Sequence, residues 1–285
     1  MIRIGTTTLP VAGWAADPRN PDASRELRLA AIRQVVTGYG LAAVELTLDF
    51  AAVYPQVFDA GFYRAVADLQ QELGFICTAH LPFLWVAPSS LNESLRQAST
   101  DCLCRAVEAT EGVEVQTYVL HLWGSTSSQI AIRLDQFSQP ETIIAGMMGQ
   151  ARRSLTQLCD ILDPRDLCLE NLDDPLFEAA LPLVKEFGAS ICLDVGHLPW
   201  RGDSEQEFLA QHGRLIREVH LHDAVGALPE ASTLFRDHLS LGSGQIDYLA
   251  FLSALEAVGY EGAVILEMNS QKDLEESLER VKSFL

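Results

Sequence analysis

The strongest constraint on the fold of this chain is a regular alternation between short apolar runs and longer segments with helical periodicity. The apolar runs are rich in Ile, Val, Leu and Cys and lie at residues 2–7, 43–48, 75–80, 117–121, 167–171, 190–194, 218–222 and 263–268. The segments between them carry apolar residues at three- and four-residue spacing, at 23–38, 62–73, 92–111, 140–162, 176–187, 204–212, 248–258 and 272–284. Eight repeats of strand then helix in 285 residues match an α/β fold, the (β/α)8 or TIM barrel, in both count and length.

A single TIM-barrel domain over residues 1–285 is therefore the predicted architecture. The main alternative is an open, doubly wound sheet, which usually has fewer strands and carries a G-x-G-x-x-G motif after its first strand. The first apolar run, in "RIGTTTLPVAG", lacks that motif. Hydrophobic residues make up 48% of the chain and charged residues 21%, and no linker rich in Pro, Gly or Ser divides it.

Charge and composition exclude several kinds of partner. The net charge is −19, and only three of the twenty basic residues are lysines. Nucleic-acid binding draws its affinity from neutralised phosphates, so we expect no DNA or RNA partner. No uninterrupted apolar run approaches about 18 residues and no basic leader opens the chain, so we expect a cytoplasmic protein without a membrane partner. The six cysteines lack C-x-x-C spacing, which favours reduced thiols.

Polar residues gather at the ends of the apolar runs, where a TIM barrel forms its active site. These residues are His80, His121, Glu170, Asn171, Asp194, His220, His222 and Glu267, and two more histidines, His197 and His238, follow in loops. Any one of them alone is usually a cap or a packing partner. Together, uncompensated carboxylates and imidazoles at one barrel mouth would be costly, and a divalent cation is the natural compensation.

The chemistry of these side chains restricts the metal. Carboxylates and imidazoles without a thiolate suit Mn²⁺, Zn²⁺, Fe²⁺ or Co²⁺ better than Ca²⁺, which prefers oxygen ligands alone. His220 and His222 point to the same side of their strand because side chains alternate with period two. The sequence therefore predicts a mixed oxygen and nitrogen metal site, with the identity of the metal open among these four.

Seven motifs carry a family resemblance, and they run in order across nearly the whole chain. They are "AHLPF" (79–83), "VLHLWG" (119–124), "CLENLDD" (168–174), "CLDVGHLPW" (192–200), "VHLHDA" (219–224), "DHLSLGSGQIDY" (237–248) and "VILEMN" (264–269). In this order they resemble the xylose-isomerase-like TIM barrels, also called the AP endonuclease family 2 superfamily. The resemblance implies a metal-dependent enzyme with its site at the strand ends.

The resemblance also implies a ligand set. Single-metal sugar isomerases and epimerases of the superfamily use Glu, Asp, His and Glu after the fifth to eighth strands, which match Glu170, Asp194, His222 and Glu267. Polynuclear members, which resemble endonuclease IV and hydrolyse phosphodiesters, add histidines that match His80, His121, His197 and His238. Their pattern has an aspartate two residues before the last histidine, and Arg236 occupies that place here. We therefore expect one or two ions rather than three, with His220 one layer deeper as a partner of the ligands.

Two chemistries fit this set, and hydrolysis of a small-molecule phosphodiester is the main prediction. Two ions would polarise the phosphoryl group between Glu170 and Glu267, with His197 as a further catalytic residue. Arg201 and Arg236 either contact phosphate oxygens or are exposed loop arginines.

The alternative is a sugar or sugar-phosphate isomerase or epimerase. It would use one ion, with Glu170 and Glu267 moving a proton between carbons and His197 binding a hydroxyl. No lysine lies near a strand end, which argues against a Schiff-base aldolase. A metal-free binding module is a second alternative.

The tryptophans bear on the substrate. Trp14, Trp85, Trp123 and Trp200 each follow an apolar run within about eight residues, where barrel loops form. We expect them to wall a ligand with a large flat or apolar part, although a single loop tryptophan usually packs on the rim.

Further motifs narrow the resemblance within the superfamily. "RIGTTTLP", "TAHLPF", "YVLHLWG", "CLENLDDP" and "CLDVGHL" look most like the cobamide-remodelling phosphodiesterases, which implies a corrinoid substrate. "LGSGQIDYLAFLSAL" resembles the sugar isomerases instead. The resemblance does not decide whether the protein forms a homo-oligomer.

Overall fold

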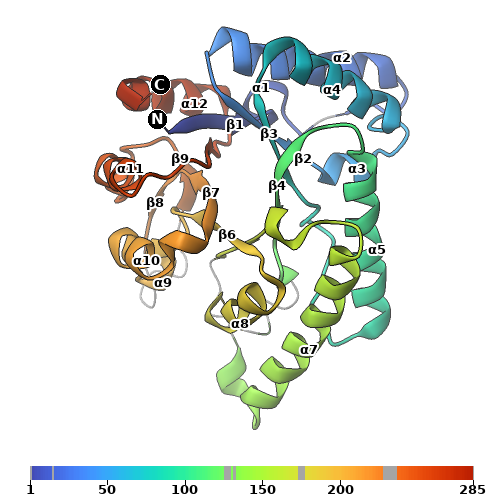
Figure 1. Cartoon of the computed structure of the whole chain (residues 1–285), viewed down its shortest axis with the longest axis vertical. Helices are drawn as coiled ribbons and strands as arrows, with labels where there is room; N and C mark the ends of the chain where they lie inside the picture. Colours follow the sequence, from blue (N-terminus) through green and yellow to red (C-terminus); the bar gives the residue numbers. More distant parts are fainter. Residues whose placement is uncertain are drawn as a thin grey trace.

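The computed structural model describes residues 2–14, 16–124, 130, 133–172, 177–226 and 236–284, and of residues 200 and 201 it describes the backbone alone. Eight parallel strands close into a barrel in the order β1-β10-β7-β6-β5-β4-β3-β2, which confirms the predicted TIM barrel (Figure 1). The barrel strands are β1 (Arg3–Thr7), β2 (Ala43–Thr47), β3 (Ile76–His80), β4 (Val115–Leu120), β5 (Leu167–Glu170), β6 (Ser190–Asp194), β7 (Ile216–Leu221) and β10 (Ala263–Leu266).

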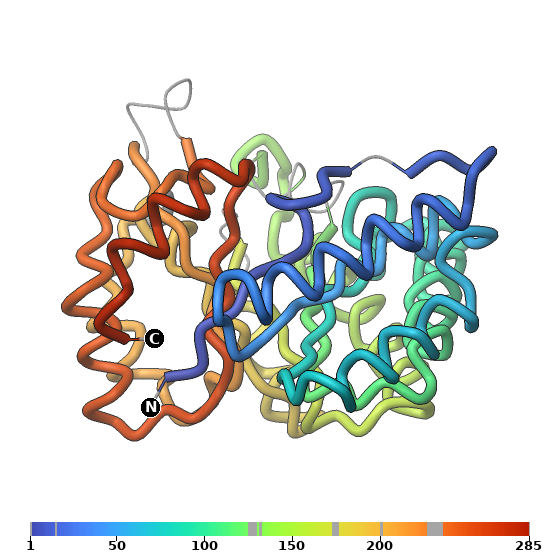
Figure 2. The backbone as a smooth tube through the Cα atoms, turned by 90° about the horizontal axis from the view of Figure 1, so that it is seen from above, coloured from blue at the N-terminus to red at the C-terminus, as the bar shows by residue number. Residues whose placement is uncertain are grey.

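A helix follows each barrel strand and packs outside it. These helices are α2 (Pro21–Arg33), α4 (Ala60–Leu73), α5 (Glu93–Ala109), α7 (Pro140–Cys159), α8 (Phe177–Phe187), α10 (Glu205–His212), α11 (Tyr248–Ala257) and α12 (Gln271–Val281). Six of them begin at a side chain that accepts a hydrogen bond from the first turn, namely Asn20, Asp59, Asn92, Ser204, Asp247 and Ser270. Figure 2 shows this ring of helices from a second direction, with the two chain ends side by side.

The apolar core lies in two places. The larger part fills the space between strands and helices, where each helix turns its apolar face inward. A smaller part lies inside the barrel and includes Ile265 with Ala43, and Val119 with Cys168. The six cysteines are free thiols, of which Cys77, Cys168 and Cys192 are buried and Cys102, Cys104 and Cys159 are half-buried.

Short elements on the carboxyl side of the barrel escaped the sequence analysis. The helices α1 (Leu9–Ala12), α3 (Asp49–Val53) and α9 (Leu198–Arg201) follow β1, β2 and β6 directly. An antiparallel pair, β8 (Asp223–Val225) with β9 (Arg236–Leu239), follows β7. The π-helix η1 (Gln34–Gly38) extends α2, and 3₁₀ turns lie at η2 (Leu134–Gln136), η3 (Pro164–Asp166), η4 (Gly213–Leu215) and η5 (Lys282–Phe284).

The β8–β9 pair is held by a buried carboxylate. Asp223 accepts hydrogen bonds from the backbone N–H groups of Ala224, Gly244 and Ile246, at 2.9, 2.8 and 3.0 Å. These bonds fasten the segment after β9 to the end of β7. The position of β9 therefore depends on Asp223 as well as on its strand partner.

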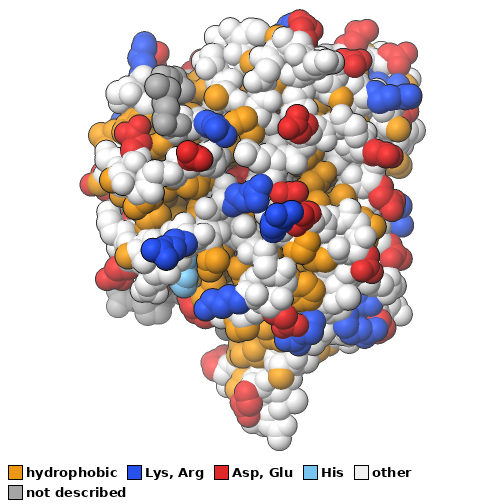
Figure 3. Space-filling model, viewed as in Figure 1, with side chains coloured by type: hydrophobic (Ala, Val, Ile, Leu, Met, Phe, Trp, Pro, Cys, Tyr) orange, Lys and Arg blue, Asp and Glu red, His pale blue; other side chains and the backbone are white. Residues whose placement is uncertain are grey.

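Basic and acidic side chains are mixed on the surface. On the face seen in Figure 3, Lys and Arg side chains lie among Asp and Glu side chains. Two arginines pair with glutamates at 2.7 Å, Arg33 with Glu72 and Arg152 with Glu186. Charges paired in this way do not add up to the basic stripe that nucleic acids bind. Among the described residues, no helix is both long and apolar enough to cross a membrane.

Candidate metal centre

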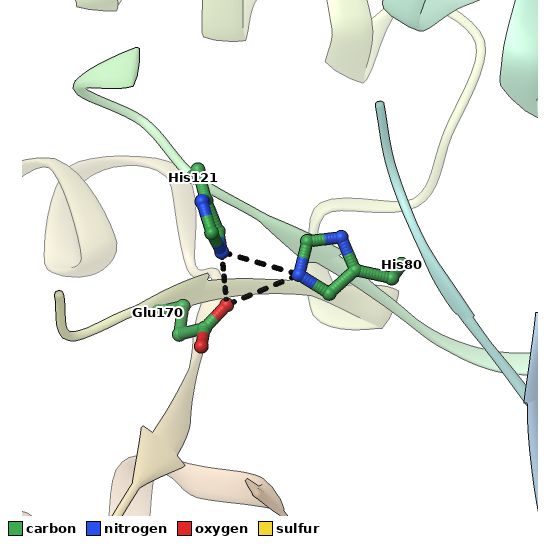
Figure 4. A group of neighbouring side chains, drawn as sticks. All are labelled: His80, His121 and Glu170. Atoms are coloured by element: carbon green, nitrogen blue, oxygen red, sulfur yellow. Dashed lines mark hydrogen bonds and ion pairs between the residues drawn. The ribbon is translucent and has the colours of Figure 1, made fainter. Parts of the chain in front are cut away.

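Three side chains from neighbouring strands point toward one another at the barrel mouth (Figure 4). His80 ends β3, His121 follows β4 and Glu170 ends β5. Nε2 of His121 lies 2.7 Å from Oε2 of Glu170, and Nε2 of His80 lies 3.3 Å from the same oxygen. The two imidazole nitrogens are 3.2 Å apart. Two nitrogens that share one carboxylate oxygen need a proton or a cation between them.

A second group lies at the ends of β6 and β7. Nε2 of His222 is 3.1 Å from the carboxylate of Asp194, and Nδ1 of His197 is 3.6 Å from Oδ2 of Asp194. Gly196 makes this arrangement possible, because a Cβ at that position would lie 1.9 Å from Cε1 of His222. Asn171, which follows β5, fastens the end of that strand to β6, since its side chain accepts from the N–H of Asp194 and donates to the carbonyl of Asp194, both at 2.8 Å.

His238 reaches the site from β9. Its ring stacks on that of His222, with centroids 4.1 Å apart and an angle of 11° between the planes. Its backbone N–H donates to Nδ1 of His222 at 2.9 Å, and its Nε2 lies 3.5 Å from Oε2 of Glu267. His238 has a φ of 51°, which costs a residue other than glycine about 1–3 kcal/mol. The hairpin holds this residue in a strained conformation above the site.

His220 lies at the centre of the carboxylates. Its Nδ1 is 3.2 Å from Oε1 of Glu170 and 3.5 Å from Oε2 of Glu267. Ligand atoms of Glu170, Asp194, His220 and Glu267 all lie within 4.8 Å of one another. His222 forms comparable groups with Asp194 and His197, and with His238 and Glu267. His220, which we expected one layer below the ligands, thus lies close to three of the expected ligands, Glu170, Asp194 and Glu267.

The pKa shifts of three groups in the cluster favour an ionised Glu170 and protonated His80 and His238. Burial raises the pKa of Glu170, but the charges of His121 and His220 outweigh burial and hold that pKa well below its ordinary value. Burial lowers the pKa of His80, but its hydrogen bond and charge interaction with Glu170 raise it to about 9.

The pKa of His238 is shifted in the same direction as that of His80. Burial lowers its pKa, but hydrogen bonds to Asp237 and Glu267 raise it to about 11. In this state the imidazolium groups supply the positive charge that the carboxylates require.

The donor set fits a divalent cation. Oε2 of Glu170 is buried and makes no hydrogen bond of good geometry within the described part of the chain, although it lies next to two imidazoles. A metal ion would replace the imidazole protons and bind that oxygen, which is how such sites release protons on metal binding. Carboxylate oxygens and imidazole nitrogens are ligands for Mn²⁺, Fe²⁺, Co²⁺ and Zn²⁺.

A cavity of about 400 Å³ opens over the cluster. Its polar lining includes His80, His121, Glu170, His197, His238 and Glu267, and Trp14, Phe83, Leu84, Leu9 and Met268 are among its apolar walls. The indole of Trp14 packs against Phe50 and Phe83, with ring centroids 5.6 and 6.4 Å away. A ligand here would meet charged groups below and an aromatic wall at the side.

Three of the other residues expected to contact substrate, Trp85, Trp123 and Arg236, do not line this cavity. Trp123 is 2% exposed and belongs to the apolar core, because its ring packs inward rather than toward the mouth. Trp85 is 71% exposed and Arg236 is exposed, and neither lines the cavity. The side chains of Trp200 and Arg201 fall outside the described part of the chain.

Two acidic residues near the site were missed by the sequence analysis. Asp237 lines the cavity and lies 3.8 Å from Nε2 of His197. Glu45 lines the cavity floor from β2, where it is fully buried in the middle of an apolar strand. A charged residue at an inward position of a buried strand is the signal that could have identified Glu45.

Comparisons with known proteins identify the family of the chain. The family described as Xylose isomerase-like TIM barrel matches residues 34–284. The uncharacterized protein MJ1311 of Methanocaldococcus jannaschii is 26% identical over 242 residues, which cover 78% of this chain and 74% of that protein.

Solved structures share the fold. A D-tagatose 3-epimerase-like protein superimposes with a TM-score of 0.73 at 20% identity, over 99% of this chain and 97% of that one. The 3-keto-D-glucoside 4-epimerase YcjR of E. coli superimposes with a TM-score of 0.69 at 18% identity, over 99% and 98%.

Proposed function

Because the chain belongs to the xylose isomerase-like TIM barrel family, we propose that it is a divalent-metal-dependent enzyme that acts on a small molecule at the carboxyl ends of its barrel strands. The cluster of buried carboxylates and imidazoles at that end supports a metal, since their side chains lie within metal-binding distance of one another. The cavity above them is of a size that suits a small ligand.

The reaction we propose is isomerisation or epimerisation of a sugar or sugar phosphate. The observation that carries it is the pair of carboxylates from β5 and from the end of β10, Glu170 and Glu267, which approach the same nitrogen of His220 from two strands. The structural relatives named above include sugar epimerases, which supports the same reading. A phosphodiester substrate, the main prediction from the sequence, receives no such support.

The chemistry follows from these residues. Glu170, Asp194, His222 and Glu267 would hold the ion, which supplies a positive charge that polarises a sugar carbonyl. One of the two glutamates would take a proton from the carbon beside the carbonyl, and the other would return a proton on the opposite face. His197 and His238, which line the cavity, would bind substrate hydroxyl groups.

One observation keeps phosphodiester hydrolysis as a second candidate. His80 and His121 converge on Glu170 and offer ligands beyond the four that one ion requires (Figure 4). A second ion bound there would favour in-line attack on a phosphoryl group, because two metals stabilise both the attacking and the leaving oxygen. The apolar wall formed by Trp14 and Phe83 would suit a substrate with a flat apolar part, such as a corrinoid.

Deuterium exchange separates the two reactions. The protein loaded with Mn²⁺ is incubated in D₂O with a panel of ketoses, and separately with bis-p-nitrophenyl phosphate or a cobamide. An epimerase is expected to place deuterium on a sugar carbon, because its glutamates exchange protons with solvent, whereas a hydrolase splits the diester with water into a phosphate monoester and an alcohol or phenol. Glu267→Gln should abolish either activity, and Glu256→Gln, an exposed glutamate of α11, should not.

Metal content gives an independent measurement. Elemental analysis of the loaded protein is expected to find one ion per chain for the epimerase and two for the hydrolase. A chain that binds no Mn²⁺, Zn²⁺, Fe²⁺ or Co²⁺ would be a binding module instead, and the proposed function would be wrong.

A further inference from the structure

Beneath the mouth, the barrel interior contains a chain of charged side chains from three strands. Oε2 of Glu45 on β2 lies 3.2 Å from Nε2 of His220 on β7. Nδ1 of the same ring lies 3.2 Å from Oε1 of Glu170 on β5. Glu45 and His220 are fully buried and Glu170 is 4% exposed. Both nitrogens of one imidazole therefore face carboxylates, one below the ring and one at the candidate metal centre.

Burying the carboxyl group of Glu45 inside the barrel costs free energy. Layers inside a TIM barrel are usually filled with branched apolar side chains, and all five residues of β2 are buried. Oε1 of Glu45 has no hydrogen-bond partner among the described residues. A buried ion pair such as that of Glu45 with His220 can often be replaced as a whole by apolar residues without loss of stability. Stability alone therefore does not account for Glu45, and its contact with His220 does.

We propose that Glu45 is a positioning residue of the metal centre, which acts by holding the ring of His220 so that Nδ1 faces Glu170 and Glu267. The contact fixes the imidazole from below, and the imidazole in turn fixes the two carboxylates at its other nitrogen. The proposal rests on the proposed function, because it assigns Glu45 a role toward the ion that those carboxylates would bind. Partners of metal ligands commonly change metal affinity about 10–100-fold when they are removed.

The same layer offers a matched control. Glu218 lies on β7, two residues before His220, and is fully buried. Its Oε2 accepts a hydrogen bond from the hydroxyl of Thr117 on β4. Glu218→Gln therefore replaces a carboxyl group at the same depth, on a side chain that bonds to a threonine and lies near Glu45 and His220 without an ion pair to the imidazole.

The experiment compares Glu45→Gln and Glu218→Gln with the unchanged chain. Mn²⁺ affinity is measured by titration calorimetry on metal-free protein. The ring nitrogens of His220 are observed by ¹⁵N NMR of the metal-free protein and assigned with His220→Gln. We expect Glu45→Gln to weaken Mn²⁺ binding about 10–100-fold and to shift the Nε2 signal of His220. We expect Glu218→Gln to bind Mn²⁺ within about twofold of the unchanged chain, since it leaves the contacts of the imidazole in place.

Several outcomes would overturn the proposal. Unchanged affinity and unchanged ring signals in Glu45→Gln would show that His220 is held without Glu45. An equal loss in Glu218→Gln would show a general effect of charge in this layer. If Glu45→Gln does not fold, Glu45→Asp withdraws the carboxylate by about 1.5 Å and should weaken Mn²⁺ binding in the same range; normal affinity there also refutes the role.

Failure of the proposed function gives a different result. If the unchanged chain itself binds no Mn²⁺, the metal centre is wrong and so is the role of Glu45 toward it. The ring signals of His220 in the metal-free variants then report separately whether Glu45 holds the imidazole.

Discussion

Gly196→Ala should disrupt the metal centre by displacing one side chain, the imidazole of His222. The φ angle of Gly196 is not positive, so alanine can adopt the same backbone conformation. The new methyl group would lie 1.9 Å from Cε1 of His222, whereas ordinary contact begins near 3.4 Å. The ring must therefore move by roughly 1.5 Å, the difference between those two distances. That displacement would separate His222 from Asp194, which it now contacts at 3.1 Å.

The expected effect on metal binding is large. Metal–nitrogen bonds tolerate deviations of about 0.2 Å, so a shifted imidazole is lost as a ligand. We expect the affinity for Mn²⁺ to fall at least about 100-fold, which corresponds to about 2.7 kcal/mol. The metal-free protein should lose only about 1–3 kcal/mol in its free energy of unfolding, the usual cost of overpacking.

Calorimetry with Mn²⁺ and urea unfolding in EDTA measure the two effects. The matched control is Gly149→Ala on α7, where an added Cβ meets nothing within 4 Å. That substitution should leave Mn²⁺ affinity unchanged and stabilise the helix slightly. If Gly196→Ala binds Mn²⁺ as tightly as the unchanged chain, His222 is not a ligand and the reasoning is refuted.

Three further predictions concern the same region. The pKa of His80 is raised to about 9, so its stabilising contribution is complete below pH 6.5 and is lost as the pH rises toward 9; urea unfolding in EDTA across this range should show the loss, and His80→Gln should lack it. Mn²⁺ at 100 times its Kd should raise the free energy of unfolding by about 2.7 kcal/mol, and EDTA should reverse the gain, as thermal melts would show. Asp223→Asn should cost about 1–3 kcal/mol in urea unfolding and weaken Mn²⁺ binding, because the carboxylate that holds Gly244 and Ile246 also places His238, whose backbone and ring contact His222; unaltered Mn²⁺ affinity would show that the hairpin does not support His222 as a ligand.

The barrel was predictable because its signals are local. Buried parallel strands read as short apolar runs, and helices that pack on them repeat apolar residues every three or four positions. Strand β6 occupies the predicted residues, and β10 lies within its predicted run. The hairpin β8–β9 was missed because its strands, of three and four residues, are too short and too polar to show a period.

The details of the site depend on the register of the barrel strands, that is, on which residues of neighbouring strands pair. The sequence alone does not determine this register. In the closed barrel Asp194 pairs with His220, so these two residues lie at the same height. The stagger between strands that sets this pairing arises from closure of the whole sheet. The motif match alone selected His222 as a metal ligand. This residue lies two positions after His220 and nearer to the barrel mouth. The charge of Glu45 within an apolar strand is visible in the sequence, but its contact with His220 depends on how the strands are placed around the barrel.

The position of His238 has a consequence for how such enzymes diverge. Glu170 and Asp194 end barrel strands, whose positions are fixed by the closed sheet. His238 belongs to a hairpin outside the barrel and is presented by a strained backbone. A lineage can therefore gain or lose this one side chain by remodelling the β8–β9 hairpin, and with it change what the same barrel mouth binds.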